Sequence, residues 1–490
     1  MSYKKEGESY LAYKQRVIDP KGSSFCGAKW YNATIWLGAG MKSSCHHPPA
    51  HRIPLKDILK NYKAIHNTQH SKNTRKQMQE GVRPPECEYC WRIEDMERDA
   101  ISDRVFKTVI YTDQELMKAQ EMPWDQDVNL IALEISFDRT CNFACSYCNA
   151  SFSTTWAKDI KKEGPYQNLV SDGAKAFQQD GAWAQPYKHD EENPYIEAFW
   201  KWWESDLSKG LRELRITGGE PLMSNQVWKL FDYFKDHPSD MLFSINSNMG
   251  GKPELIDKLI EKTHNVQNFD LYTSCEATGK QAEYIRDGLH YEYWKDNMRR
   301  LITNGNVRST HVMMTINSLC LFSMTDFVDE MLEMREELGK GQLICSFNLL
   351  RFPSFMSPLA LPEHLKKDRH DQIKGWLNSK KNHPLLHEME RDGIARLIDY
   401  LDIVKTPHRR TSSLDSQQRD FRSFYEQYDR RRGKRFRMTF PQNLVEWYDS
   451  IPENKVGVWQ GLVEGDSTKG INAELQTDYN PGQDSEGNPT

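Results

Sequence analysis

Between residues 129 and 350 the sequence alternates short apolar runs, typical of strands, with longer segments typical of helices. The six runs are NLIALEISF (129–137), LRELRIT (211–217), MLFSIN (241–246), NFDLYTS (268–274), HVMMTINS (311–318) and LICSFNLL (343–350). Parallel strands need crossover connections, and helices are the usual ones. The alternation therefore predicts an α/β fold, and six such units indicate a partial, TIM-like (β/α)6 barrel.

The segments outside these units divide the chain further. Residues 20 to 105 hold four cysteines and show little strand patterning, and the insertion after the first strand is too long for one crossover. The polar C-terminal end, rich in Gly, Asn, Asp and Pro, is predicted to be disordered. We expect an N-terminal arm (1–19), a small Cys-rich domain (20–110), the barrel (125–352) with its insertion (150–208), a helical C-terminal extension (353–451) and the tail (452–490).

Composition excludes some classes of protein. The net charge of -5 on 57.3 kDa argues against a surface that binds polyanions in general. The sequence has no apolar stretch of 18 residues or more, and its N-terminus lacks the apolar core of a secretory signal. We therefore expect a soluble, cytoplasmic protein without a membrane partner. In a reducing cytosol, clustered cysteines are more often metal ligands than disulfides.

Three cysteines follow the first predicted strand within CNFACSYC, at Cys141, Cys145 and Cys148. A four-iron cubane ordinarily takes one cysteine for each iron, so three thiolates leave one iron open to another ligand. A zinc site or a chance cluster is the alternative. The position directly after a strand favours the iron–sulfur interpretation.

This pattern, C-x3-C-x-aromatic-C with Tyr147 as the aromatic residue, resembles that of the radical SAM superfamily. The resemblance implies that Cys141, Cys145 and Cys148 are catalytic and hold a 4Fe-4S cluster whose open iron chelates S-adenosylmethionine (SAM). One electron, from a donor such as flavodoxin or ferredoxin, would cleave SAM and give a 5'-deoxyadenosyl radical. That radical would abstract hydrogen from an unactivated carbon.

The second predicted strand ends in ITGGEPL, and Gly218, Gly219, Glu220 and Pro221 match the superfamily's GGEP motif. By resemblance, this motif holds the methionyl amino group of SAM. Glycine at a strand end lets the backbone approach a ligand closely, and the Glu220 carboxylate can compensate a cationic amine.

Polar residues at the ends of the later strands complete the SAM contacts that the resemblance implies. Asn246 and Asn248 would lie near the methionyl part or the ribose. Ser274 and Arg286 would meet the ribose and the methionyl carboxylate, which suits the planar guanidinium group. Asn317 would approach the adenine. A structural role in capping a strand is at least as common for such residues.

Four further cysteines, Cys26, Cys45, Cys87 and Cys90, converge from separate segments and can close a zinc site or ligate a second iron–sulfur cluster. Their segments resemble the auxiliary-cluster segment of SPASM and twitch radical SAM proteins, although those modules more commonly follow the barrel. The resemblance spans residues 25 to about 450. We favour an auxiliary iron–sulfur cluster over zinc.

Other polar groups have simpler interpretations. His46 and His47 can replace a cysteine ligand, but adjacent surface histidines are more common. Cys275, Cys320 and Cys345 lie in or beside predicted strands and are expected to be buried and inert. Catalysis by Cys275 is the alternative.

Two further features bear on the substrate. Glu276 is a candidate substrate contact. The basic segment DRRRGKRFRMTF, Asp429 to Phe440, can bind phosphates, but we favour a structural or substrate-docking role over nucleic-acid binding.

The sequence thus predicts a radical SAM enzyme that acts on a small molecule or peptide by oxidation, thioether formation or rearrangement. One alternative is a maturase that modifies a peptide or protein. Another is a non-catalytic iron–sulfur or zinc protein with a redox or nucleic-acid-binding role.

Overall fold

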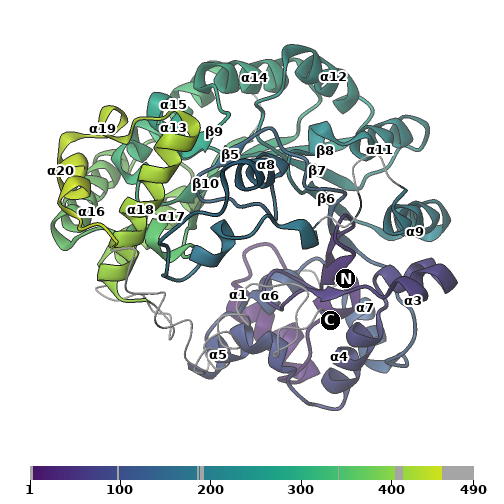
Figure 1. Cartoon of the computed structure of the whole chain (residues 1–490). Helices are drawn as coiled ribbons and strands as arrows, with labels where there is room; N and C mark the ends of the chain where they lie inside the picture. The colour runs from purple at the N-terminus through teal and green to yellow at the C-terminus, as the bar shows by residue number, and fades with distance from the viewer. Residues whose placement is uncertain are drawn as a thin grey trace, which may run out of the picture. The chain divides into compact units, whose positions relative to one another are not determined.

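The computed structural model describes residues 4–96, 99–184, 187, 192–339, 342–402 and 412–454 (Figure 1). All but the first three residues of the predicted tail lie outside this set. The described residues form two compact units. Unit 1 takes its residues from Met1–Phe137 and Tyr187–Arg215, and unit 2 from Asp138–Pro186 and Ile216–Leu462.

Unit 1 contains four strands: β1 (Asn32–Trp36), β2 (Met41–Ser43), β3 (His51–Arg52) and β4 (Ala132–Ser136). β1 pairs parallel to β4 and antiparallel to β2. The first three strands differ from the sequence interpretation, which found little strand patterning there. β1 is buried on both faces, so it needs none of the apolar and polar alternation by which a strand is recognised.

The helices of unit 1 are α1 (Tyr10–Tyr13), α2 (Ala28–Tyr31), α3 (Leu55–Lys60), α4 (Gln69–Gln79), α5 (Glu88–Met96), α6 (Asp103–Thr108), α7 (Asp113–Glu121), α9 (Pro194–Trp202) and α10 (Ser208–Gly210). Their apolar residues form one core that includes the fully buried Tyr13, Trp30 and Leu116. The N-terminal segment therefore packs into unit 1 through Tyr13. α7 begins with a capping box in which Thr112 and Glu115 exchange hydrogen bonds.

Unit 2 is built on parallel strands in the order β7 (Leu242–Ser247), β8 (Asn268–Thr273), β10 (Ser309–Ile316) and β11 (Gln342–Leu349). Their registers align Asn246 with Tyr272 and His311 with Ile344. β6 (Glu213–Thr217) runs from unit 1 into unit 2. Each of the six predicted runs thus contains a strand. The mostly parallel sheet confirms the predicted α/β class and fits a partial TIM-like fold.

Helices connect these strands of unit 2 (Figure 1). They are α8 (Thr154–Glu163), α11 (Asn225–Asp236), α12 (Pro253–Thr263), α13 (Gly279–Ile285), α14 (Tyr291–Asn304) and α15 (Met324–Leu338). Leu259 of α12 and Trp294 of α14 are fully buried, like Phe269 of β8. Burying each such side chain contributes roughly 1.5–3 kcal/mol.

The C-terminal extension is helical, as predicted, with α16 (Glu363–Lys380), α17 (Glu388–Leu401), α18 (Leu414–Arg432), α19 (Phe436–Thr439) and α20 (Gln442–Ser450). α18 buries one aromatic face, and its Phe424 ring lies 4.8 Å from Phe177. Aromatic contacts of this kind fix the helix to the rest of unit 2. No helix among the described residues has both the length and the apolar character needed to cross a membrane.

Candidate functional site

The three predicted ligands Cys141, Cys145 and Cys148 lie in a loop of unit 2, here called the cysteine loop (141–148). Within it β5 (Ala144–Cys145) pairs antiparallel with β9 (Arg286–Asp287), so Cys145 lies opposite Arg286. The thiol-bearing stretch is therefore fixed by backbone hydrogen bonds to a segment far away in the sequence.

Hydrogen bonds around α8 fix the loop from its other side. The Cys148 amide donates to the Cys145 carbonyl at 2.9 Å, which closes a turn. The Trp156 indole donates to that same carbonyl at 2.9 Å, and the Thr155 hydroxyl donates to the Cys141 carbonyl at 2.6 Å. All three cysteines keep partial exposure, so the loop holds its thiols in place while leaving them accessible.

Burial raises the pKa of each thiol in the loop, to about 12 for Cys141. A thiol with so high a pKa is protonated at neutral pH and is a poor nucleophile. A bound metal ion deprotonates the thiols that ligate it, whatever their pKa without metal. The loop is therefore suited to ligation rather than nucleophilic attack.

Within the described residues, no group of three or more His, Cys, Asp and Glu side chains is arranged to hold a metal ion.

The GGEP turn lies directly against the start of the cysteine loop. The Glu220 amide donates to the Thr140 carbonyl at 2.6 Å. A Cβ atom added to Gly219 would overlap the carbonyl oxygens of Arg139 and Thr140, and Gly218 has a φ of 125°. Both positions therefore require glycine, which explains why the motif can lie beside the cysteines.

The Glu220 carboxylate is buried at 3% exposure and accepts three hydrogen bonds. The donors are the Leu222 amide at 3.0 Å, the Ser247 hydroxyl at 2.8 Å and the Asn248 amide at 2.7 Å. Burial raises the pKa of Glu220 to about 7 although these donors favour the ionised form. Glu220 thus links the GGEP turn to the end of β7 and carries a charge that a nearby cation would stabilise.

Two asparagines, Asn248 and Asn142, join the end of β7 to the cysteine loop. The Asn248 side chain donates to Asn142 Oδ1 at 2.8 Å and accepts from the Gly250 amide. The Oδ1 atom of Asn246 is buried and has no hydrogen-bond partner among the described residues. The sequence predicted Asn246 and Asn248 as site residues but not Asn142. The one feature of the sequence that pointed to Asn142 is its position within the cysteine loop.

Arg286 forms a buried ion pair with Glu276. Its Nε and Nη2 atoms donate to Glu276 Oε2 at 3.0 and 2.8 Å, and its Nη1 atom lies 3.7 Å from Cys145 Sγ. The Tyr147 hydroxyl donates to the other Glu276 oxygen at 3.1 Å. The structure therefore brings the predicted Arg286 and Tyr147 together, and it shows Glu276 orienting both of them.

The remaining predicted SAM contacts have different surroundings. Ser274 directly follows β8 and is partly exposed. Asn317 is 2% exposed, and its Oδ1 atom accepts from the amides of Leu319 and Cys320 at 3.0 Å. Its side chain thus caps a turn after β10, the structural role foreseen for such residues. Cys275 is fully buried, as predicted, and so are Cys320 and Cys345.

The helix α18 supports the cysteine loop from outside the barrel. The Tyr428 hydroxyl donates to the Ala144 carbonyl of β5 at 3.4 Å. Arg432 donates to Asp287 of β9 at 3.0 Å, and its guanidinium carbon lies 4.4 Å from the centre of the Trp156 ring. The extension therefore contacts both strands that fix the loop.

Several basic side chains of the predicted basic segment, Asp429 to Phe440, form contacts with other residues of the protein. Its ionic and carbonyl partners all belong to unit 2: Arg431 bonds Gly164, Arg432 and Lys434 bond Asp287, and Arg437 bonds Asp449. Arg430 and Arg435 are exposed. These contacts support the structural role that we favoured over nucleic-acid binding.

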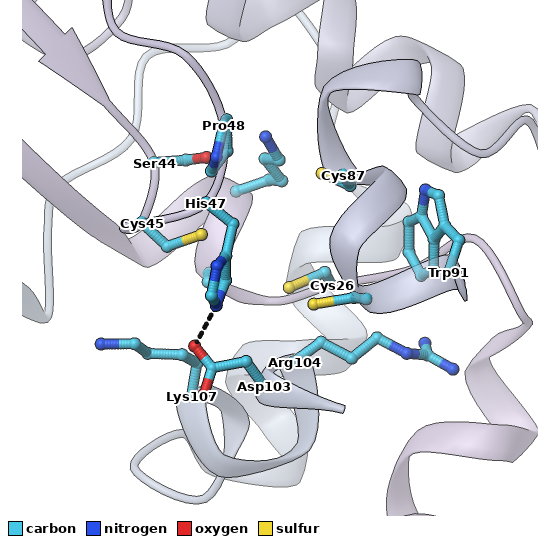
Figure 2. Close-up of a pocket in the computed structure, with 13 residues that line it drawn as sticks. Cys26, Ser44, Cys45, His47, Pro48, Cys87, Trp91, Asp103, Arg104 and Lys107 are labelled. Atoms are coloured by element: carbon cyan, nitrogen blue, oxygen red, sulfur yellow. Dashed lines mark hydrogen bonds and ion pairs between the residues drawn. The ribbon is translucent and has the colours of Figure 1, made fainter. Parts of the chain in front are cut away.

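Unit 1 holds the second cysteine site, here called the four-cysteine cavity. Cys26 precedes α2, Cys45 follows β2, Cys87 lies directly before α5, and Cys90 lies in the first turn of α5. All four line one cavity (Figure 2). The sequence prediction that these distant cysteines converge therefore agrees with the structure. Burial raises the pKa of each thiol, to about 11 for Cys87.

One of the two neighbouring histidines also lines the four-cysteine cavity. The His47 Nε2 atom lies 2.9 Å from Asp103 Oδ2, and its ring stacks on Tyr89 with the ring centres 3.8 Å apart. His46 instead lies 3.8 Å from Glu134. The Ser44 hydroxyl lines the same cavity and has no hydrogen-bond partner among the described residues. The cavity thus offers four thiols and a free hydroxyl donor.

Comparison with known proteins agrees with this geometry. The family model of the Radical SAM superfamily matches residues 135–331. The GTP 3',8-cyclase of Aliarcobacter butzleri (strain RM4018) is 27% identical over 108 residues, which are 21% of this chain and 24% of that protein. The chain thus spans about a quarter of the curated relative that it matches.

A solved structure gives a weaker likeness. The crystal structure of Streptococcus suis SuiB matches with a TM-score of 0.32 and 11% identity, covering 64% of this chain and 63% of that chain. This likeness is too low to bear on function.

Proposed function

We propose that the chain is a radical SAM enzyme that cleaves SAM reductively at the cysteine loop, because the family model of the Radical SAM superfamily matches residues 135–331. Cys141, Cys145 and Cys148 would ligate a 4Fe-4S cluster. When bound, the cluster supplies one electron that breaks the C5'–S bond of SAM, giving methionine and a 5'-deoxyadenosyl radical. A substrate carbon would then lose hydrogen to that radical.

The residues around the loop fit SAM. Gly219 lets the turn lie against the backbone of Arg139 and Thr140 at the start of the cysteine loop, and Glu220 offers a carboxylate that a cationic amine would hold ionised. The unpartnered Oδ1 atom of Asn246 can accept a hydrogen bond from a ribose hydroxyl or an amine. This orphaned acceptor near the end of β7, two residues before the Asn248 side chain that bonds Asn142 of the cysteine loop, is the observation that carries the proposal.

Arg286 would orient the methionyl carboxylate. Glu276 accepts from Nε and Nη2, and Cys145 Sγ lies 3.7 Å from Nη1, so one N–H of Nη1 and one N–H of Nη2 are the donors left for that group. Asn248 and Asn142 would keep the end of β7 at a fixed distance from the cysteine loop. The proposed roles of Ser274 and Asn317 near the ribose and adenine stay predictions.

The experiment uses the full chain, reconstituted with iron and sulfide without oxygen. With dithionite and SAM, the wild-type protein should release 5'-deoxyadenosine, and SAM should change the electron paramagnetic resonance (EPR) spectrum of the reduced cluster. Cys275→Ala, which removes a buried thiol outside the loop, should do both as well. Reduced iron–sulfur protein that binds SAM but releases no 5'-deoxyadenosine would refute the proposal.

We also propose that residues 20–110 form a twitch-like domain whose four-cysteine cavity holds an auxiliary iron–sulfur cluster. Its thiols suit iron and zinc alike. The unpartnered Ser44 hydroxyl can donate to a sulfide or thiolate sulfur, which a cubane presents toward its surroundings. Cys148→Ala protein should retain iron and sulfide in this cavity. Zinc without iron in that variant would refute the auxiliary cluster.

A further inference from the structure

Positively charged side chains line the four-cysteine cavity, while two of their carboxylate partners do not. Lys29, Arg104 and Lys107 all line it (Figure 2). Lys29 pairs with Glu86 and Arg104 with Glu94, and neither glutamate is among the lining residues. Three cations therefore belong to the wall of the cavity, with Asp103 as the one carboxylate among the lining residues. A metal centre with four thiolates carries net negative charge, which this arrangement stabilises.

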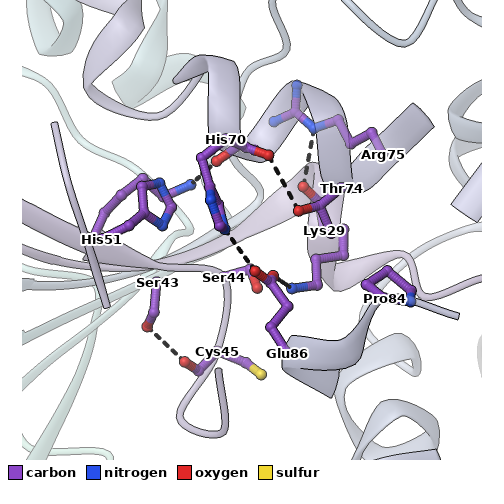
Figure 3. A network of polar contacts seen from close by, with 12 residues as sticks. Lys29, Ser43, Ser44, Cys45, His51, His70, Thr74, Arg75, Pro84 and Glu86 are labelled. Carbon is purple, nitrogen blue, oxygen red and sulfur yellow. Dashed lines mark hydrogen bonds and ion pairs between the residues drawn. The ribbon is translucent and has the colours of Figure 1, made fainter. Parts of the chain in front are cut away.

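Lys29 lies between this cavity and a second, smaller one. The second cavity is lined by Lys29 and Glu86 together with His51 and His70. Glu86 accepts from Lys29 on one oxygen and contacts His70 on the other at 2.6 Å (Figure 3). Glu86 thus holds the Lys29 ammonium group from the side away from the four-cysteine cavity.

The Lys29 charge is placed to act on one particular ligand. Its side chain is 5% exposed, it lines the same cavity as Cys87, and its partner Glu86 directly precedes Cys87 in the chain. The Arg104 guanidinium group is occupied by Glu94 and by the Phe25 carbonyl at 2.7 Å. Lys107 is partly exposed, so solvent screens its charge. Lys29 therefore combines burial with a place beside Cys87 on the wall of the cavity.

We propose that Lys29 is a positioning residue that donates a hydrogen bond to the Cys87 sulfur and makes the metal centre of the four-cysteine cavity easier to reduce. This inference rests on the auxiliary iron–sulfur cluster proposed above. Hydrogen bonds to cluster sulfurs and nearby charge both set the reduction potential of such clusters. A buried positive charge favours the reduced state because reduction adds one negative charge.

The test is an EPR-monitored redox titration of full-length protein that carries Cys148→Ala, so that only the four-cysteine centre responds. Adding Lys29→Met should shift the midpoint potential to more negative values, while Lys29→Arg should keep it near the parent value. Lys107→Met, which removes an exposed charge of the same cavity, is the matched control and should shift it less.

Glu86→Gln provides a test of opposite sign. It removes the negative charge beside Lys29 and leaves Lys29 in place, so the midpoint potential should shift to more positive values. This variant decides the matter if Lys29→Met loses its iron. Unchanged potentials in iron-loaded Lys29→Met, or in Glu86→Gln, would overturn the role of Lys29 alone. Zinc in the parent protein would overturn the auxiliary cluster and this inference together.

Discussion

The two cysteine sites are built in opposite ways. The cysteine loop takes all its thiols from one stretch of eight residues, and distant segments are needed only to fix that stretch. The four-cysteine cavity takes its thiols from three separate segments, so the fold of unit 1 creates the ligand set itself. The difference teaches that a local motif can be predicted from sequence directly, whereas a convergent one depends on tertiary structure.

The surroundings of the two sites also differ in charge. Beside the cysteine loop, one buried arginine, Arg286, is balanced by Glu276 and faces Cys145. The lining of the four-cysteine cavity includes three cations and one carboxylate. We infer that the first site is arranged to admit a charged ligand with its own amine and carboxylate. The second is arranged to enclose a negatively charged centre.

The largest expected effect separates the sites completely. Cys148→Ala should abolish 5'-deoxyadenosine release, because a cluster held by two thiolates loses its anchorage, while the four-cysteine cavity keeps its iron. Cys90→Ala should instead remove iron from the four-cysteine cavity and leave a SAM-responsive cluster in the cysteine loop. Iron and sulfide analysis with EPR measures both. Loss of both centres in either single variant would break the comparison.

A second prediction concerns the buried ion pair. Glu276→Leu leaves Arg286 charged and unpaired, so the free energy of unfolding should fall by about 3–5 kcal/mol. Urea denaturation of the metal-free protein measures it. The control is Glu292→Leu, which removes a glutamate that is 69% exposed and paired with Lys295, and should change stability by less than about 1 kcal/mol. An equal decrease in the free energy of unfolding in the two variants would contradict a stabilising role of the buried ion pair.

A third prediction follows from the raised pKa of Glu220. The folded pKa of about 7 exceeds the unfolded value of 4.5, so between these values the native state holds a proton that the unfolded state has lost. Stability without SAM should therefore fall as pH rises from about 5 to 7, by roughly 3 kcal/mol in total from this group, and level off above. Glu220→Gln should lack this slope.

The same carboxylate should make SAM binding pH-dependent. The cationic amine of SAM favours ionised Glu220, so the affinity for SAM should rise as pH increases through about 7. Isothermal titration calorimetry across this range measures it. Glu261→Gln, an exposed position on α12, is the control and should behave as wild type. A wild-type slope in Glu220→Gln would assign the effect to another group.

The smallest expected effect tests the support from α18. Arg432→Met removes the contacts with Asp287 and the Trp156 ring, so the cysteine loop should hold its cluster about tenfold less tightly, as for other residues behind a metal ligand. Iron retention during dilution or chelation measures it. The exposed Arg430 on the same helix supplies the control, Arg430→Met. Equal retention in both variants would remove α18 from the comparison.

Much of the fold followed from pattern alone. The six apolar runs became strands because each is long and bounded by turn residues, and the helical extension followed from its helix-like pattern. The short β1 could not be predicted, since it is buried on both faces and carries polar residues at Asn32 and Thr34. A strand of this kind is defined by its neighbours rather than by its own sequence.

The site was predictable to the same degree. The three loop cysteines and the GGEP turn could be assigned because spacing and glycine carry their chemistry. Asn142 could not, because it acts on Asn248, which is 106 residues away in the sequence. Glu276 was a candidate substrate contact, but its pairing with Arg286 depends on how the chain folds after β8. The role of Lys29 depends on the direction of one ammonium group, which sequence does not record.

The contact of Gly219 with Arg139 and Thr140 has a mechanical consequence. Two peptide backbones touch there with no intervening side chain to absorb a displacement. Whatever pushes on the turn must therefore also move the start of the neighbouring loop. A ligand that binds at the turn would then also shift the cysteine loop, so ligand binding and the position of the loop would change together.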